Sequence, residues 1–418
     1  MTDVITRTSA EPATTPAPAG TSGQTPTAPR LVSPFERLGL RGRALRTANR
    51  LGVVAGVYLL ITAVNLIGSG FKTATGDSAE SLFAFASNPF VALMVGILFT
   101  AAAQSSSTTT SVTVGLVAGG LPIEIAIPML LGANVGTTLT NTLVSLGAAR
   151  DRVAFRRAFS AATVHDFFNL IAVAIFLPLE LGFDVLERSS AWVADQTSGS
   201  DGGLFAAVFG GLGGVISAGT KPLSDAVKHG TELIPGAWHG IVMIALGVAL
   251  ILAVISFLGT LLKVLMVGRA ATVLHAAIGR GPVSGVASGA AVTVMVQSSS
   301  TTTSLMIPLA SSGAFSLREI YPFTVGANIG TTITALIAAF AFTGAEAEVA
   351  LQAAYVHLLF NVYAALVIFC LPGIRELPLR AATWLGTVAS INKLWAAAWV
   401  LGVFVLVPAA LIGATVVW

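Results

Sequence analysis

The chain has 418 residues, of which 55% are apolar and only 10% are Asp, Glu, Lys or Arg, whereas a soluble globular domain carries roughly 25% charged residues on its water-facing surface. The mean hydropathy of +0.85 is typical of helices that pack in lipid, so the composition predicts a polytopic membrane protein in a lipid bilayer. A net charge of +3 offers no basic domain, so no nucleic acid is expected as a partner.

The N-terminal residues 1–50 are expected to form a disordered, basic, cytoplasmic tail. Residues 1–30 are rich in Thr, Pro, Ala, Gly and Ser, a composition that cannot bury enough apolar surface to fold. Four arginines between Arg37 and Arg46 then precede the first apolar stretch. Because basic flanks stay in the cytoplasm, this pattern predicts a cytoplasmic N-terminus and a first membrane helix instead of a cleaved leader.

Several later stretches are long and apolar enough to cross the hydrocarbon core, which takes about 20 residues of helix. The expected crossings are 51–68, 158–178, 237–262, about 320–342, 350–371 and 394–417. The stretch 73–149 contains no Lys or Arg but is too long for one crossing and is broken by Gly and polar runs. A Gly-rich segment at 204–219 fits either a peripheral or a short re-entrant piece.

Three polar blocks occur twice in the chain and in the same order. The pairs are Gln104–Ser111 with Gln297–Ser304, which are identical; Gly132–Thr138 with Gly326–Thr332, which differ by Val for Ile; and Val164-His165, Phe168-Asn169 with Val356-His357, Phe360-Asn361. The offsets between the copies are 193, 194 and 192 residues. Three blocks at nearly one offset indicate two copies of one unit.

The charges between the blocks predict that the two copies are inverted. The loop after the first Gly-Ala-Asn block carries four arginines between 150 and 157, whereas the equivalent loop of the second copy holds Glu346 and Glu348 and no basic residue. The positive-inside rule places the first loop in the cytoplasm and the second outside. Inverted repeats are common in secondary transporters, whose substrate lies where the repeats meet.

The predicted fold is therefore an all-α polytopic membrane protein with two inverted-topology repeats, each a re-entrant helical hairpin plus a broken transmembrane helix and a further crossing. The expected segments are a tail at 1–50, a first transmembrane helix and external loop at 51–87, repeat 1 at 88–178, an extracellular linker and connecting transmembrane helix at 179–280, repeat 2 at 281–372, and a C-terminal interfacial and transmembrane segment at 373–418.

The hydroxyl-rich blocks are expected at the tips of the hairpins, which span 88–119 and 281–313. Each block lies between apolar arms of roughly 13 residues, too short to cross a bilayer. The Gly-Ala-Asn-x-Gly-Thr-Thr blocks are expected to unwind the following helix, because two glycines flank an Asn. The alternatives are hydroxyls that bond to their own helix and glycines that serve helix packing.

Helix N-termini and hydroxyls at the protein centre predict a site for an oxyanion. No Lys or Arg lies near either block to bind an anion by formal charge. Carbonyl and side-chain oxygens suit Na⁺, so bound sodium is expected to offset the charge of the anion. No other cofactor and no transition metal are expected, and the single Cys370, in an apolar run, predicts a buried thiol.

Three ionisable residues of the repeated region have open roles. His165 and His357 correspond between the copies, and a structural hydrogen bond is favoured over a proton relay. Asp166 has no counterpart, because Leu358 stands at the equivalent position, and it is expected to pair with one of the nearby arginines, Arg156 or Arg157.

The paired blocks, together with Phe155-Arg156-Arg157-Ala158-Phe159 leading to Thr163-Val164-His165-Asp166, resemble the type II sodium–phosphate cotransporter family. The resemblance covers residues from about 50 to 385. It implies sodium-driven uptake of inorganic phosphate, with phosphate and sodium ions as partners, and a cell inner (plasma) membrane location. The cysteine-free linker points to a bacterial member, and a homodimer is an open expectation for its assembly.

The resemblance also implies roles for individual residues. Phosphate binding is expected at Gln104, Ser105, Ser106, Ser107, Gln297, Ser298, Ser299 and Ser300. Sodium binding is expected at Ser107, Thr108, Asn134, Thr137, Ser300, Thr301, Asn328 and Thr331. The alternative function is a sodium-independent anion channel or a transporter of another small oxyanion. An intramembrane hydrolase, and with it an enzyme, is disfavoured because its nucleophile–base pair is asymmetric while every polar block here is duplicated.

Overall fold

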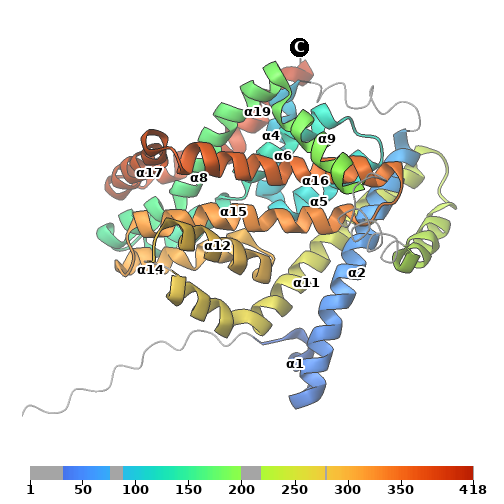
Figure 1. Cartoon of the computed structure of the whole chain (residues 1–418), viewed down its shortest axis with the longest axis horizontal. Helices are drawn as coiled ribbons and strands as arrows, with labels where there is room; N and C mark the ends of the chain where they lie inside the picture. Colours follow the sequence, from blue (N-terminus) through green and yellow to red (C-terminus); the bar gives the residue numbers. More distant parts are fainter. Residues whose placement is uncertain (1–31, 76–87, 199–217, 278–279, 418) are drawn as a thin grey trace, which may run out of the picture.

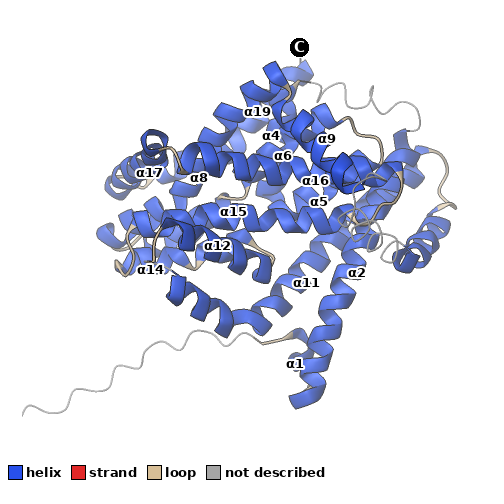
Figure 2. Cartoon of the chain, viewed as in Figure 1, coloured by secondary structure: helices blue, strands red, loops and turns tan. Residues whose placement is uncertain are grey.

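The computed structural model describes residues 32–75, 88–198, 218–277 and 280–417, and this part of the chain is helical without any strand (Figure 2). Most of the Gly-rich segment at 204–219 lies outside the described residues. A helix is described over 218–231. The other helices are α1 (Pro34–Arg37), α2 (Gly42–Thr75), α4 (Pro89–Ala103), α5 (Ser106–Ala118), α6 (Ile123–Gly136), α7 (Leu139–Ser145), η3 (Leu146–Ala148), α8 (Arg152–Phe183), α9 (Val185–Ser198), α11 (Ala237–Ala277), α12 (Pro282–Val296), α13 (Ser299–Ser304), α14 (Met306–Ser312), α15 (Leu317–Ala339), α16 (Ala345–Ala364), η4 (Ala365–Phe369), α17 (Pro372–Ile391), α18 (Leu394–Leu401), η5 (Gly402–Leu406) and α19 (Val407–Val417).

Seven stretches of the described chain are long and apolar enough to cross a membrane, and the protein is a multi-pass membrane protein. They are Gly42–Thr75, Ile123–Ala148, Arg152–Phe183, Ala237–Leu262, Leu317–Ala339, Ala345–Phe369 and Leu394–Thr415. Each crossing predicted from the sequence falls within or largely overlaps one of them. The orientation of the two copies in a membrane stays a prediction.

The two hydroxyl-rich blocks form the turns of two helical hairpins. The first hairpin consists of α4 and α5, and the second of α12 followed by α13 and α14. The first arms, α4 and α12, have 15 residues each. At a rise of about 1.5 Å per residue each arm is roughly 22 Å long, shorter than the hydrocarbon core of about 30 Å.

The Gly-Ala-Asn blocks differ from the prediction of two unwound helices. In the first copy α6 ends at Gly136, and Thr137 and Thr138 form a turn before α7. In the second copy α15 continues as an α-helix through the whole of Gly326–Thr332, so the prediction of unwinding there is wrong. The broken helix is a feature of the first copy alone.

The glycines of these blocks instead let helix backbones approach closely. A Cβ at Gly132 would overlap the carbonyl oxygen of Leu93 on α4, and one at Gly326 would overlap that of Val286 on α12. Each hairpin thus packs its first arm against the Gly-Ala-Asn helix of its own copy. Small residues commonly serve this purpose between membrane helices.

The second arm of each hairpin packs against helices of the other copy. In the centre of Figure 1, α15 and α16 run side by side, and α5 packs against both of them. The second hairpin makes the matching contacts, because α13 packs against α7 and α14 against α8. The longest helices, α2 and α11, pack against each other beside this core. The hairpins therefore interlock the two copies.

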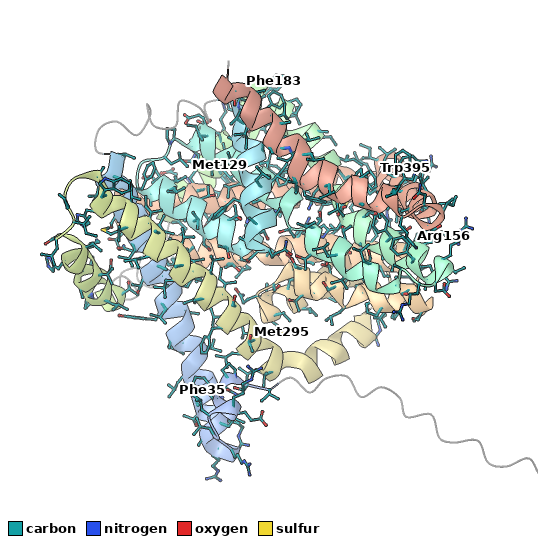
Figure 3. All side chains as sticks on the ribbon, turned by 180° about the vertical axis from the view of Figure 1, so that it is seen from behind. Phe35, Met129, Arg156, Phe183, Met295 and Trp395 are labelled. Atoms are coloured by element: carbon teal, nitrogen blue, oxygen red, sulfur yellow. The ribbon has the colours of Figure 1, made fainter. Side chains whose placement is uncertain are left out.

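Helix α8 runs between two distant parts of the molecule. Arg156 lies near its N-terminal end, close to the segment that carries Trp395, whereas Phe183 ends the helix far away (Figure 3). The prediction of a buried Cys370 is wrong, since this thiol, just after η4, is exposed on the protein surface. An apolar run in a membrane protein has a lipid-facing side, so apolar sequence does not imply burial within the protein.

Candidate functional site

The tip of the first hairpin reverses the chain with one left-handed residue and one extended residue. Gln104 has a φ of 53°, a conformation that costs a residue with a side chain roughly 1–2 kcal/mol. Ser105 is extended with φ of −156° and caps α5, because its Oγ accepts a hydrogen bond from the Thr108 amide at 3.2 Å. The hydroxyl block therefore starts a helix at the tip.

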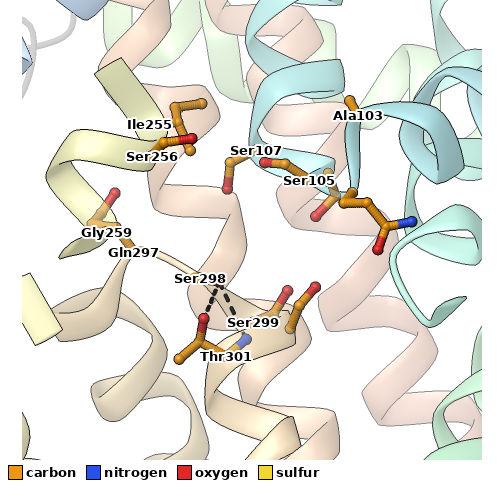
Figure 4. A pocket seen from close by; sticks show the side chains of 13 residues that line it. Ala103, Ser105, Ser107, Ile255, Ser256, Gly259, Gln297, Ser298, Ser299 and Thr301 are labelled. Atoms are coloured by element: carbon orange, nitrogen blue, oxygen red, sulfur yellow. Dashed lines mark hydrogen bonds between the residues drawn. The ribbon is translucent and has the colours of Figure 1, made fainter. Parts of the chain in front are cut away.

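The tip of the second hairpin has the same backbone conformation. Gln297 has a φ of 54° and Ser298 a φ of −158°. The Oγ of Ser298 accepts from the Thr301 amide at 3.2 Å, and the Ser298 and Thr301 hydroxyls are 2.9 Å apart (Figure 4). The identical sequences thus form the same turn in two different surroundings.

Each glutamine is held at both ends of its amide. The amide nitrogens of Gln104 and Gln297 donate to the carbonyl three residues earlier on their own helices, at 2.7 and 2.8 Å. Their amide oxygens accept from Thr140 and Thr334, each at 2.9 Å. These threonines are not among the site residues predicted from the sequence, although they share the 194-residue offset of the Gly-Ala-Asn blocks. The glutamines fasten the tips to the next helix of their own copy.

The two tips face each other across one cavity of about 240 Å³, which α11 closes on another side (Figure 4). No Lys, Arg, Asp or Glu is among the described residues that line it. The lining residues are Ala103, Gln104, Ser105, Ser106, Ser107, Ile255, Ser256, Gly259, Gln297, Ser298, Ser299, Ser300 and Thr301. All eight residues expected to bind phosphate are therefore brought together, and the hydroxyl groups of Ser256 and Thr301 also line the cavity.

The residues expected to bind sodium are not gathered at one place. Ser107, Ser300 and Thr301 line the cavity. Thr108, Thr137 and Thr331 are buried beside it without lining it, and Thr331 donates to the carbonyl of Ala327 on its own helix at 3.0 Å. Asn134 and Asn328 lie in a separate polar cluster.

This cluster joins the two copies through histidine and asparagine. His165 Nε2 is 2.5 Å from the side-chain oxygen of Asn328 in the second copy, and His357 Nε2 is 3.4 Å from that of Asn134 in the first. All four side chains are buried. Each histidine thus makes the structural hydrogen bond that the sequence favoured, and the partner is an asparagine of the other copy.

Asp166 does not pair with the nearby arginines. It is fully buried, and its Oδ2 accepts a hydrogen bond of 2.6 Å from the indole nitrogen of Trp399 on α18. The arginines Arg156 and Arg157 instead line a separate cavity of about 510 Å³ at the end of α14. The sequence could not indicate the tryptophan, which lies more than 200 positions away.

Comparisons with known proteins match both copies of the repeat to one known family. The Na⁺/Pi-cotransporter family model matches residues 59–181 and 250–372, one stretch for each hairpin. No solved structure matches this chain.

Curated relatives include sodium-dependent phosphate transport protein 2A of Rattus norvegicus, 31% identical over 92% of this chain and 70% of that protein. The sheep (Ovis aries) protein 2A is 31% identical over 85% of this chain and 66% of its own length, and the bovine (Bos taurus) protein 2B is 29% identical over 86% and 64%. The chain thus spans about two thirds of the length of these relatives. On these matches, the chain belongs to the Na⁺/Pi-cotransporter family and is a transporter, not an enzyme.

Proposed function

We propose that this protein carries inorganic phosphate into the cell together with sodium ions, and that phosphate binds in the cavity between the two hairpin tips. The observation that carries the proposal is that Gln104–Ser107 and Gln297–Ser300, nearly 200 residues apart in the chain, line one cavity. The identity of the ions is inferred from the family and from the names of the relatives, and their position is inferred from the cavity.

The cavity can bind an oxyanion only through neutral groups. Serine hydroxyls and backbone N–H groups donate to phosphate oxygens, and α5 begins at the cavity with its positive dipole end. Formal charges are absent among the described lining residues. Phosphate in such a low-dielectric place needs compensating cations, so phosphate and sodium are expected to bind together. This mutual requirement couples the two fluxes.

Sodium is proposed to bind at oxygen atoms of both copies, some of which line the cavity while others are buried away from it. The candidates are Ser107, Thr108, Asn134, Thr137, Ser300, Thr301, Asn328 and Thr331. The hydroxyl of Thr137 is buried and has no hydrogen-bond partner within the described chain, which leaves its oxygen available as a ligand. A hard cation such as sodium prefers such oxygen ligands.

Transport is proposed to occur by alternating access between two inverted copies in the inner (plasma) membrane of a bacterial cell, with the N-terminus in the cytoplasm. Three candidate spans separate the hairpins within the described residues: Ile123–Ala148, Arg152–Phe183 and Ala237–Leu262. An odd number of crossings between two hairpins supports opposite orientations. One tip would then admit phosphate from outside and the other release it inside.

The proposal is tested by uptake of labelled phosphate into proteoliposomes that contain the purified protein. Accumulation against a gradient is expected only when sodium is outside. Equal flux without sodium would indicate an anion channel, and stronger inhibition by sulfate than by unlabelled phosphate would indicate another oxyanion as the substrate.

Two serines test the site itself. Ser106→Ala and Ser299→Ala are each expected to abolish uptake without loss of folding, because each removes a hydroxyl that lines the cavity. The matched control is Ser288→Ala on α12, since the hydroxyl of Ser288 is buried and bonds to its own helix at 2.9 Å. Uptake at the control level in both cavity variants would refute the assignment of the site.

A further inference from the structure

One asparagine without a counterpart connects the second hairpin to the first copy. Asn141 on α7 donates to the Thr303 hydroxyl at 2.7 Å and accepts from the Ser304 hydroxyl at 3.0 Å. Its amide nitrogen also lies 3.4 Å from His165 Nδ1. Asn141 therefore provides partners for three polar groups that meet beside the second tip. At the 194-residue offset of the Gly-Ala-Asn blocks the equivalent position is Ala335.

Two of the three polar groups equivalent to those satisfied by Asn141 are unpartnered beside the first tip, and the third, the hydroxyl of Thr110, donates to the carbonyl of Ser107 at 3.3 Å. The counterpart of Ser304 is Ser111, and the counterpart of His165 is His357. Ser111 Oγ and His357 Nδ1 are both buried and have no hydrogen-bond partner among the described residues. The methyl group of Ala335 can neither donate a hydrogen bond to them nor accept one.

Two further atoms follow the same pattern. Thr108 Oγ1 and Asn361 Oδ1 are buried and lack a partner within the described part of the chain. Their counterparts have partners: the hydroxyl of Thr301 accepts from Ser298, and the oxygen of Asn169 accepts from Asn328 at 2.7 Å. These four unpartnered atoms belong to α5 and α16.

The four atoms lie on two helices that pack together. Thr108 and Ser111 are three residues apart on α5 and so share a face, and His357 and Asn361 are four apart on α16. α5 packs against α16, and both pack against α6. From α6, the side-chain oxygen of Asn134 holds the Asn361 amide nitrogen at 3.1 Å and His357 Nε2 at 3.4 Å. Asn134 therefore engages the donor end of each side chain.

We propose that Thr108, Ser111, Asn361 and His357 form a binding site for one sodium ion beside the first tip. The second tip has no equivalent site, because Asn141 bonds to the groups there. The inference rests on the proposed function, since it assigns one of the coupling ions. An unsatisfied buried polar group costs about 1–3 kcal/mol, so four of them on two helices that pack together indicate a ligand. Three of the four are oxygens, the ligands that hard cations prefer.

The position of this site links it to phosphate. Thr108 lies one helical turn below Ser105 of the first tip, which lines the phosphate cavity. A cation there would offset the charge of phosphate at short range. Phosphate binding at the first tip would then depend on sodium. At the second tip, where Asn141 holds the polar groups, it would not.

The decisive variant is Ala335→Asn, which places beside the first tip the amide that Asn141 provides beside the second. Binding of radioactive sodium to the purified full-length protein, measured without phosphate, is expected to fall by one ion per chain. In proteoliposomes, fewer sodium ions should enter per phosphate. Since the larger side chain can impair folding, Ser111→Ala gives a second test that adds no volume, and we expect it to raise the sodium Kd about tenfold or more.

The matched control for Ser111→Ala is Thr113→Val. Both hydroxyls are buried on α5, but that of Thr113 donates to the carbonyl of Thr109 on its own helix at 2.9 Å. Thr113→Val should keep the wild-type sodium affinity. If Ser111→Ala and any folded Ala335→Asn also keep it while wild-type uptake still requires sodium, water satisfies these atoms and only this inference fails. If wild-type uptake needs no sodium, the proposed function fails first.

Discussion

Gly330→Ala tests whether the glycines of the second Gly-Ala-Asn block serve packing or unwinding. A Cβ at Gly330 would lie 2.5 Å from the carbonyl oxygen of Ala290 and 2.8 Å from Thr293 Cβ, both on α12. Carbon–oxygen contacts are normally about 3.3 Å or longer, so α12 must move by nearly 1 Å. Overpacking of this kind costs typically about 1–3 kcal/mol.

Thermal unfolding in detergent measures this cost. We expect Gly330→Ala to lower the Tm by roughly 2–8 °C. The control is Gly413→Ala on α19, where nothing lies within 4 Å of the added Cβ. There alanine favours the helix, so the Tm should stay equal or rise. A Gly330→Ala protein as stable as the control would mean that α15 and α12 are not in close contact at Gly330. The reasoning from packing would then be refuted.

Two further substitutions address the site. Thr334→Val removes the donor to the partly buried Gln297 and should raise the KM for phosphate about fivefold, the equivalent of roughly 1 kcal/mol. Thr140→Val should change the KM less than about twofold, because water reaches the exposed Gln104. Equal effects of the two variants would contradict this reasoning. Asp166→Asn should raise the sodium concentration for half-maximal uptake, since Asp166 Oδ1 is buried without a hydrogen-bond partner among the described residues and a cation would stabilise the carboxylate there. An unchanged sodium dependence would argue against it.

The elements that the sequence predicted well are those whose conformation depends on local residues. The two identical blocks Gln104–Ser111 and Gln297–Ser304 form the same left-handed turn and the same capped helix start, because the short-range steric and hydrogen-bonding requirements are the same. Apolar length likewise predicted the crossings. The pairing of the two tips across one cavity could be expected from the repeat.

The features that the sequence did not predict depend on contacts with residues that are distant in the sequence. A glycine pair has the same appearance whether it unwinds a helix or accommodates a neighbour, and only the carbonyl of Val286 against Gly326 decides between them. The partner of Asp166 is Trp399, from a helix outside the repeats. The difference between Asn141 and Ala335 is visible in the sequence, but its meaning requires the positions of Ser304 and Ser111.

The scarcity of charge around the cavity leads to a last prediction. Ser256 on α11 lines the cavity, so Ser256→Lys would add a fixed positive charge where sodium is proposed to act. A charge of opposite sign to phosphate contributes roughly 1–4 kcal/mol at the separations and dielectric of such a cavity. Phosphate binding to the purified variant should then need less sodium, by about fivefold or more, and uptake should be less tightly coupled to sodium.

The matched variant is Ser256→Met, which has a long side chain without a charge. It should keep the sodium requirement of the wild type, so that any difference between the two variants reports charge and not size. If Ser256→Lys binds phosphate but needs as much sodium as Ser256→Met, then sodium does more than neutralise the anion, for example by ordering the tips. The absence of fixed charge would then not be the reason why phosphate requires sodium.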